Sequence, residues 1–226
     1  MVLRKYLGAG ALTLVAGLAV AGCAPVQMGA AAVTGNQRVT IANLDTEAGK
    51  LATAAKLYPG AVSLSSQQIT TETLSWLIRF KITDQLANQA GITVTSADGE
   101  KALADVLAQA QAQSGQSVTL ELLMVANGIA PNLVTQLGRF QAIQDKFAEN
   151  ANGGTLPTTS AQQTAVGAQL TRAQCLAAKS LDIKVNPQFG RIDYTKSFTI
   201  VPVADTVSRA SGTTQTASQT GLTPAC

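Results

Sequence analysis

Hydrophobic residues recur every three or four positions through most of residues 41–180, and this spacing predicts a series of amphipathic helices. Gly91 follows the clearest stripe, and a glycine there suits a helix end because it adopts left-handed backbone angles at little cost. The pattern therefore predicts a long, buried helix within residues 70–91. Its apolar face consists of Leu74, Leu77, Ile78, Ile82 and Leu86.

Local signals place the other helices. A helix is expected from Ile41, capped by Thr40, to the neighbourhood of Pro59. Thr95 and Asp98 have the spacing of a capping box, and Pro131 suits the first turn of a helix that follows a short one closed by Gly128. A last helix is expected over residues 160–180, after a loop at 150–160. The buried faces expected are Leu103, Val106, Leu107 and Ala110, and then Leu133, Leu137, Phe140, Ile143 and Phe147.

The two ends of this helical region have strand character instead. Two short β-capable pieces, at residues 32–33 and 38–39, flank Gly35-Asn36, which is a hairpin signal. Residues 183–185 and 198–203 also alternate between apolar and polar positions. Because a lone two-stranded hairpin is marginally stable in water, the ends are expected to meet in one sheet. The fold class predicted is mostly α, with a small β-sheet joining the N-terminal hairpin and the C-terminal segment.

The first 22 residues have the layout of a secretory signal. Arg4 and Lys5 precede an apolar run at residues 7–20, and small residues follow it. The run is shorter than the roughly 20 residues that a membrane-spanning helix requires. An ordinary signal peptide, with a cysteine that happens to lie near its cleavage site, is one interpretation.

The other interpretation comes from residues 20–23, Val-Ala-Gly-Cys, which resemble the bacterial lipobox. This resemblance implies cleavage before Cys23 and attachment of diacylglycerol, whose acyl chains are of the palmitate type, to its sulfur. Each buried CH₂ contributes about 0.8 kcal/mol, so two or three chains hold a protein durably on a membrane. The chain is then a lipoprotein on the extracytoplasmic face of the cell membrane. Its parts are a signal peptide (1–22), a lipidated tether (23–30), a helical domain (31–204) and a polar tail (205–226) expected to be disordered.

Composition narrows the possible chemistry. The chain has no histidine, which excludes Ser-His-Asp and Cys-His catalysis and histidine zinc sites. It contains no phosphate-binding GxxxxGK loop, and no spacing singles out a pair of carboxylates. Its formal charge is +3, with no long basic run of the kind that nucleic-acid binding requires. We therefore expect no enzyme, no cofactor, no metal and no nucleic-acid partner.

Two cysteines remain besides Cys23. The outer face of a membrane permits disulfides, and Cys175 lies off the predicted buried face of its helix, where Cys226 in the tail can reach it. A Cys175–Cys226 disulfide and two free thiols are both compatible with the sequence.

Three stretches together resemble the SurA- and PrsA-type periplasmic chaperones. They are "AAVTGNQRVTIANLD", "LSWLIRFKITDQLANQAGITVTSADGEKAL" and "AAKSLDIKVNPQFGRID". The last matches the closing pattern I-x-V-N-P-x-[FY]-G through Ile183, Val185, Asn186, Pro187, Phe189 and Gly190. The chain also resembles actinobacterial lipoproteins with a SurA N-terminal domain. The family's foldases insert a parvulin isomerase domain at the place of loop 150–160, and this chain has none there, so the resemblance implies the SurA-N-like chaperone module without isomerase activity.

The function expected is chaperone-like holding of unfolded secreted polypeptides through apolar surface. The candidate client contacts are Trp76, Phe80, Phe140 and Phe147. The competing interpretation of these residues is that aromatic side chains at helical spacing belong to the core. The competing function is that of an envelope lipoprotein that binds one small ligand or one protein partner.

Overall fold

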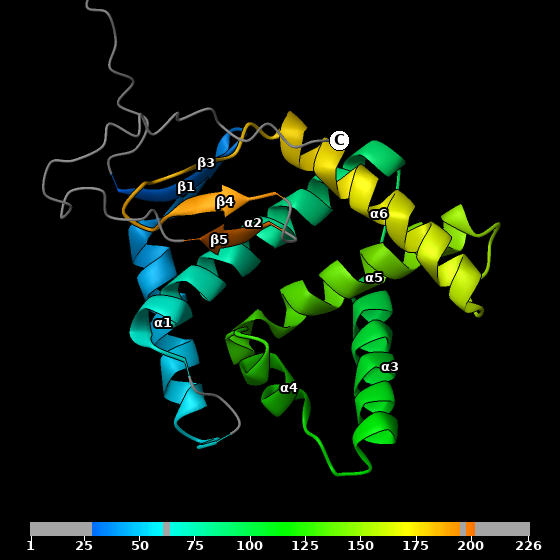
Figure 1. Cartoon of the computed structure of the whole chain (residues 1–226), viewed down its shortest axis with the longest axis horizontal. Coiled ribbons are helices and arrows are strands. Elements are labelled where there is room, and N and C mark those ends of the chain that lie inside the picture. The colour runs from blue at the N-terminus through cyan, green and yellow to red at the C-terminus, as the bar shows by residue number, and fades with distance from the viewer. Residues whose placement is uncertain (1–28, 61–63, 195–197, 202–226) are drawn as a thin grey trace, which may run out of the picture.

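The computed structural model describes residues 29–60, 64–194 and 198–201. The signal, Cys23, most of the tether and the polar tail lie outside these residues. Six α-helices, one short 3₁₀ helix and five strands make up the described part (Figure 1). The helices are α1 (Ile41–Ala55), α2 (Ser66–Ala90), α3 (Ser96–Ser114), α4 (Leu120–Ala126), η1 (Pro131–Leu133), α5 (Val134–Ala151) and α6 (Ser160–Ser180). The strands are β1 (Ala30–Thr34), β2 (Gln37–Thr40), β3 (Lys184–Val185), β4 (Arg191–Asp193) and β5 (Thr199–Val201). A mostly α fold with a small antiparallel sheet is thereby confirmed.

Side-chain caps mark the starts of α1, α2 and α3, and a glycine marks the end of α2. The Thr40 hydroxyl accepts a hydrogen bond from the Asn43 N–H, and Thr95 and Asp98 form the predicted capping box. Gly91 ends α2 with a φ of 64°, as expected for a left-handed C-cap. Helix α2 starts earlier than its apolar stripe, at a capping box of Ser65 and Gln68. The polar first turns of α2 lack the apolar periodicity that marked the rest of the helix.

Helix α2 forms the centre of the molecule. It packs against α1, α5 and α6 and against strands β1 and β5, and it runs diagonally through Figure 1. Leu74, Ile78, Ile82 and Leu86 on its predicted face are fully or almost fully buried. At about 25 cal/mol per Å² of apolar surface removed from water, this stripe is a principal source of the fold's stability.

The N-terminal hairpin and the C-terminal segment do meet, as predicted. Strand β1 pairs with β2 on one side and with β3 on the other, both antiparallel. All five residues of β1 are buried, three of them alanines, whose small side chains let the strand lie close to the helices. The prediction of one sheet was wrong for the last strand: β5 pairs with β4 in a second, two-stranded sheet.

The turn between β3 and β4 explains this division. The Asn186 N–H donates to the Ala31 carbonyl oxygen and its side-chain amide to that of Ala30, which fastens the turn to β1. Gly190 follows with a φ of 122°, and a Cβ there would collide with the Val201 carbonyl oxygen. The chain therefore reverses at residues 186–190 and leaves β1, so β4 and β5 pair with each other. The motif that carries the family resemblance has a structural role here.

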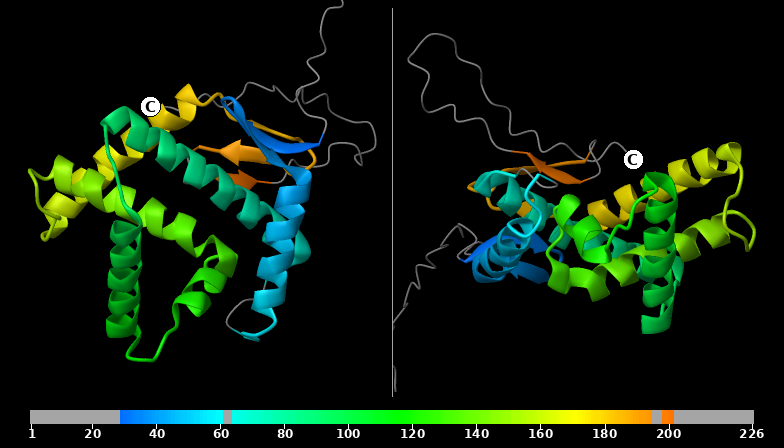
Figure 2. Two further views of the ribbon diagram at one scale, coloured as in Figure 1. Left: turned by 180° about the vertical axis from the view of Figure 1, so that it is seen from behind. Right: turned by 90° about the horizontal axis from the view of Figure 1, so that it is seen from below.

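Helix α3 lies at the far end of the molecule from the sheets (Figure 2). It packs mainly against α5, and Gly99 and Gly138 meet where the two helices cross. A Cβ built on Gly138 would lie 2.9 Å from the Gly99 carbonyl oxygen. Of the face predicted for α3, Leu103 is buried, whereas Val106, Leu107 and Ala110 are half-buried. The two backbones approach each other closely at this crossing, and hydrophobic periodicity does not reveal such an approach.

Candidate binding surface

Three aromatic rings meet between α2 and α5. Trp76 and Phe80 are one helical turn apart on α2, with ring centroids 5.7 Å apart. Phe140 of α5 packs edge-on against both, at 5.5 Å from Trp76 and 5.8 Å from Phe80. Edge-to-face pairs of this kind contribute about 0.5–1.5 kcal/mol beyond the area they bury. The sequence predicted the pair on α2, and the tertiary fold adds Phe140.

Polar contacts fix the half-buried Trp76 ring. Its indole N–H donates to the Asn127 carbonyl oxygen at 2.8 Å, and the Arg79 guanidinium lies over its face at 4.9 Å from the ring centre. Arg79 also donates to the Thr199 hydroxyl at 3.1 Å, which joins α2 to β5. Burial lowers the pKa of Arg79, partly offset by the nearby Glu72 carboxylate. The guanidinium remains charged at any physiological pH.

A hollow of about 210 Å³ opens beside this aromatic cluster. Its walls come from α2, α5, α6 and the residue just before β5, parts of the chain that are distant in the sequence. The lining side chains are Trp76, Arg79, Ile82, Thr83, Phe140, Gln144, Gln174 and Phe198. We call it the aromatic hollow. It combines aromatic faces with two amides and one cation.

The four predicted client contacts have different environments. Trp76 and Phe140 line the aromatic hollow and are half-buried, whereas Phe80 is only 7% exposed and belongs to the core. Phe147 is half-buried and packs against the core. Phe80 is therefore a core aromatic, as the competing interpretation predicted. Leu57, Leu156 and Leu176 are the exposed large hydrophobic residues of the described chain, and sequence periodicity did not indicate them.

Six of the eight side chains that line the aromatic hollow were not among the predicted client contacts, and three of these, Gln144, Gln174 and Phe198, come from outside α2. Gln144 and Gln174 carry no local signal, because glutamine is common on exposed helix faces. Phe198 stands at the start of a predicted strand run and has a φ of 61°, an unusual backbone conformation for an aromatic residue. Its side chain packs edge-on against Tyr194 at 6.1 Å. Only the tertiary fold brings these side chains beside Trp76.

A second hollow, of about 330 Å³, lies at the crossing of α3 and α5. It surrounds the contact between Gly99 and Gly138, and Arg139 at its edge forms a 2.8 Å ion pair with Asp84 of α2. Its apolar lining comes from Val94, Leu103 and Val134. We call it the crossing hollow.

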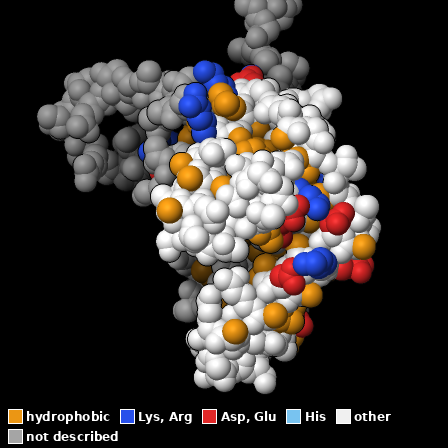
Figure 3. Space-filling view, turned by 90° about the vertical axis from the view of Figure 1, so that its right-hand side faces the viewer, with side chains coloured by type: hydrophobic (Ala, Val, Ile, Leu, Met, Phe, Trp, Pro, Cys, Tyr) orange, Lys and Arg blue, Asp and Glu red, His pale blue; other side chains and the backbone are white. Residues whose placement is uncertain are grey.

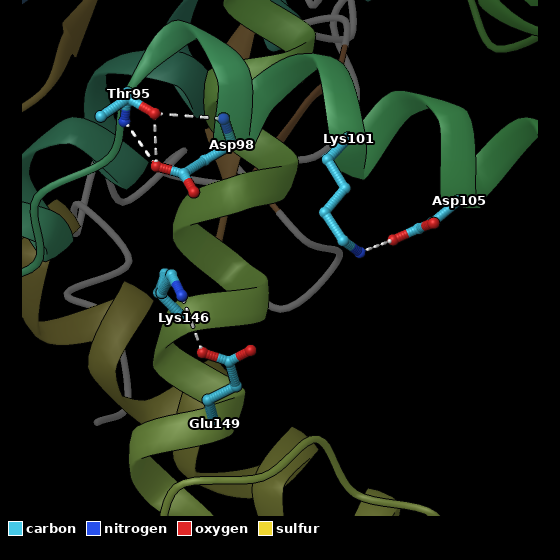
Figure 4. A network of polar contacts seen from close by, with 6 residues as sticks. All are labelled: Thr95, Asp98, Lys101, Asp105, Lys146 and Glu149. Atoms are coloured by element: carbon cyan, nitrogen blue, oxygen red, sulfur yellow. Dashed lines mark hydrogen bonds and ion pairs between the residues drawn. The ribbon is translucent and has the colours of Figure 1, made fainter.

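Charged side chains of α3 and α5 form a polar network close to this crossing (Figure 4). Lys101 pairs with Asp105, and Lys146 pairs with Glu149 at 3.0 Å. The Thr95 backbone N–H donates to the Asp98 carboxylate and lowers its pKa, whereas burial raises the pKa of Asp145. Pairs as exposed as Lys101 and Asp105, at 75% and 62%, contribute little to stability.

The end of the molecule that carries α3 has a mixed surface. Figure 3 shows hydrophobic side chains there in small groups among uncharged polar ones, with acidic and basic side chains close together. Such a surface has no strong field of one sign. Within the described residues, no group of three His, Cys, Asp or Glu side chains is placed to hold a metal ion.

Cys175 lies on α6 directly after Gln174 and is half-buried. It is disulfide-bonded, and its partner lies outside the described residues. Cys23 and Cys226 both lie outside them as well. The pairing of Cys175 with Cys226 and the lipidation of Cys23 therefore stay predictions.

No family model, no curated protein and no solved structure matches this chain. The likeness to SurA-type chaperones thus rests on the sequence motifs alone. In the described part of the chain, no helix has the length and apolar character needed to cross a bilayer.

Proposed function

We propose that this protein is a lipoprotein, anchored through Cys23 on the outer face of the cell membrane, that holds segments of unfolded secreted polypeptides. The observation that carries the proposal is the aromatic hollow, in which two of the four candidate client contacts come together. We propose no catalytic role for the hollow, and the isomerase activity of related foldases is not part of the proposal.

The size of the aromatic hollow favours side chains over whole ligands. Pockets for small-molecule ligands usually measure about 300–1,000 Å³, and this one measures about 210 Å³. A hollow of that size accepts one or two apolar side chains of an extended segment. Weak, broad binding is the expected result, because few contacts are available and many sequences supply such a side chain.

The polar lining suits the backbone of such a segment. The amides of Gln144 and Gln174 can each donate to a carbonyl oxygen and accept from an N–H. These two glutamines come from different helices, α5 and α6, on either side of the hollow. Backbone groups are common to all polypeptides, so this mode of binding does not select one sequence.

A short tether would keep the domain close to the membrane. The Gly29 carbonyl oxygen accepts a hydrogen bond from the Ile41 N–H at 2.9 Å, so the start of the folded part, just before β1, lies beside the first turn of α1. Cys23 lies six residues earlier, which limits its distance from Gly29 to about 20 Å. A client emerging at the membrane surface would therefore meet the domain at high local concentration.

An aggregation assay tests the holding function. The mature chain with Cys23→Ser, which carries no lipid, is added to several chemically unfolded, aggregation-prone proteins, and light scattering is followed. We expect suppression at near-stoichiometric amounts across clients. Gln174→Lys places a charge in the aromatic hollow and should weaken the suppression several-fold, because the charge must be desolvated by an apolar client.

Gln163→Lys is the matched control, since Gln163 is exposed on the same helix and does not line the hollow. Suppression that is absent, or equal in the two variants, would contradict the proposal. Anchoring is tested separately by intact mass of membrane-extracted protein. Acyl mass on Cys23 is expected, and a mature amino terminus at another residue would exclude it.

The crossing hollow supports a second candidate function. Its volume of about 330 Å³ falls at the lower end of the range for small-molecule sites. A protein that binds one specific ligand there should show a saturable rise in melting temperature with a single compound, and no general suppression of aggregation.

A further inference from the structure

The described chain stops beside the aromatic hollow. Phe198 lines it, and β5 ends three residues later at Val201. Gln174 of α6 also lines it, and Cys175 is the next residue on that helix. Phe198 is therefore four positions before residue 202, where the described chain has ended, and a disulfide-bonded cysteine is one position after Gln174.

The partner of Cys175 can be narrowed from chemistry. The chain has three cysteines, and the lipobox resemblance assigns Cys23 to a thioether, whose sulfur cannot enter a disulfide. In the lipidated protein this leaves Cys226 as the partner within the chain. The disulfide would then close residues 202–226 into a loop from β5 to α6.

We propose that this loop is the resident occupant of the aromatic hollow, with Leu222 as the side chain that enters it. If clients bind in the same hollow, the loop competes with them, and this competition rests on the proposed function. The occupancy of the hollow by the loop does not rest on it.

Reach and size support Leu222. It lies four residues before Cys226, so it must remain within about 14 Å of the disulfide, and Gln174 adjoins that disulfide. One leucine side chain suits a hollow of about 210 Å³. The 25 residues of the loop extend to about 85 Å at most, so closing the loop does not strain the chain.

Charge supports the same segment. Residues 210–226 contain no charged side chain and are rich in Ser, Thr, Gln and Ala. An uncharged segment enters a half-buried site without desolvating an ion. Its backbone carbonyl groups match the amides of Gln144 and Gln174, the same groups that a client segment would use.

Trp76 makes the proposal measurable, because it is the chain's single tryptophan and lines the hollow. Acrylamide quenching and the emission maximum of Trp76 are compared in the oxidised mature chain (Cys23→Ser) and after dithiothreitol. This dithiol reduces the Cys175–Cys226 bridge to two thiols and is itself oxidised to its cyclic disulfide, which balances two electrons and two protons. We expect stronger quenching and a red shift after reduction.

Two variants identify the occupant. Cys226→Ser should reproduce the effect of reduction, and Leu222→Ser should raise quenching while the disulfide stays intact. Leu156→Ser is the matched control, because Leu156 is an exposed leucine that does not line the hollow. Equal quenching in oxidised and reduced protein would overturn the proposal, as would peptide mapping that finds Cys175 bonded to another residue. No change in Leu222→Ser would overturn the assignment of Leu222.

Binding of a fluorescent, unfolded α-lactalbumin separates this proposal from the proposed function. A tethered occupant acts at a local concentration in the millimolar range, so opening the loop should tighten client binding about tenfold. If quenching changes as expected and neither form binds the probe, the occupancy stands and the holding function is wrong. If both forms bind it equally and quenching is unchanged, the holding function stands and the occupancy is wrong.

Discussion

Helices α2 and α3 were both predicted from stripes of apolar residues, but they are stabilised in different ways. α2 lies among three helices and two sheets and buries ten of its residues, whereas α3 buries three, namely Gly99, Ala102 and Leu103. α2 is thus held by packing, and α3 by its cap and by one close crossing with α5. Helices of marginal burial are expected to open locally before the whole domain unfolds.

The largest effect is expected in α2. Ile78→Ala removes a fully buried side chain from the centre of the core and should lower the free energy of unfolding by about 2–5 kcal/mol. Leu107→Ala, at a half-buried position of α3, should cost about 1 kcal/mol or less. Urea unfolding followed by circular dichroism measures both, and equal losses would remove the contrast between the two helices.

The crossing of α3 and α5 should be the next most sensitive place. Gly138→Ala puts a methyl group against the Gly99 backbone and should cost about 1–3 kcal/mol through forced separation of the helices. Gly167→Ala in α6 is the control, because a Cβ there meets no atom within 4 Å. Gly167→Ala should raise the free energy of unfolding by up to about 1 kcal/mol through its higher helix propensity. Thermal unfolding should therefore show a lower melting temperature for Gly138→Ala and a higher one for Gly167→Ala.

Removal of the cap should loosen α3 alone. Thr95→Ala deletes the hydroxyl that accepts the Asp98 N–H and should cost about 1 kcal/mol. Hydrogen exchange of amides in the first turn of α3 should accelerate, while the amides of α2 keep their rates. Ser96→Ala, at the exposed next position, is the control and should leave the exchange rates of both helices unchanged. If Thr95→Ala accelerated exchange throughout the protein, α3 and α2 would open together and the prediction would be wrong.

The smallest effect expected is one of pH. The folded-state pKa of Asp98 is lowered from 3.8, chiefly by the Thr95 N–H, so its contribution is present above pH 3.8 and is lost as pH falls through the lowered pKa. Asp145, whose pKa burial raises, acts in the opposite sense: its protonated form favours the fold, and that contribution is lost as pH rises through the raised pKa. An NMR pH titration of the Thr95 amide should show a midpoint below 3.8, absent in Asp98→Asn and retained in Asp145→Asn.

Local structure was largely predictable from the sequence. The caps at Thr40 and Thr95, the stop at Gly91 and the hairpin at Gly35 each depend on one or two neighbouring residues, and the structure confirms them. Strand β4 escaped prediction because three residues, Arg191–Asp193, are too few to show alternation. The pairing of β5 with β4 also escaped prediction, because the position of β5 depends on the turn at Gly190.

The candidate surface was predictable only in part. The Trp76–Phe80 pair follows from helical spacing, but nothing local indicates that Phe140, Gln144 and Gln174 surround it. Nor does periodicity distinguish Phe80, which is buried, from Trp76 one turn earlier, which is half-buried. These distinctions arise from how α5 and α6 cross α2, and a crossing is set by many side chains together.

The hydrogen bond from the Asn186 amide to the Ala30 carbonyl oxygen spans 156 residues and has a consequence for how the chain is made. Strand β1 is among the first parts of the domain to leave the ribosome, yet its second neighbour in the sheet arrives among the last. At about 5–20 residues per second, synthesis of the intervening chain takes on the order of ten seconds. During that interval β1 has one edge unpaired and its apolar face uncovered. A polypeptide built in this way stays incompletely folded until late, which agrees with the export that the proposed function requires.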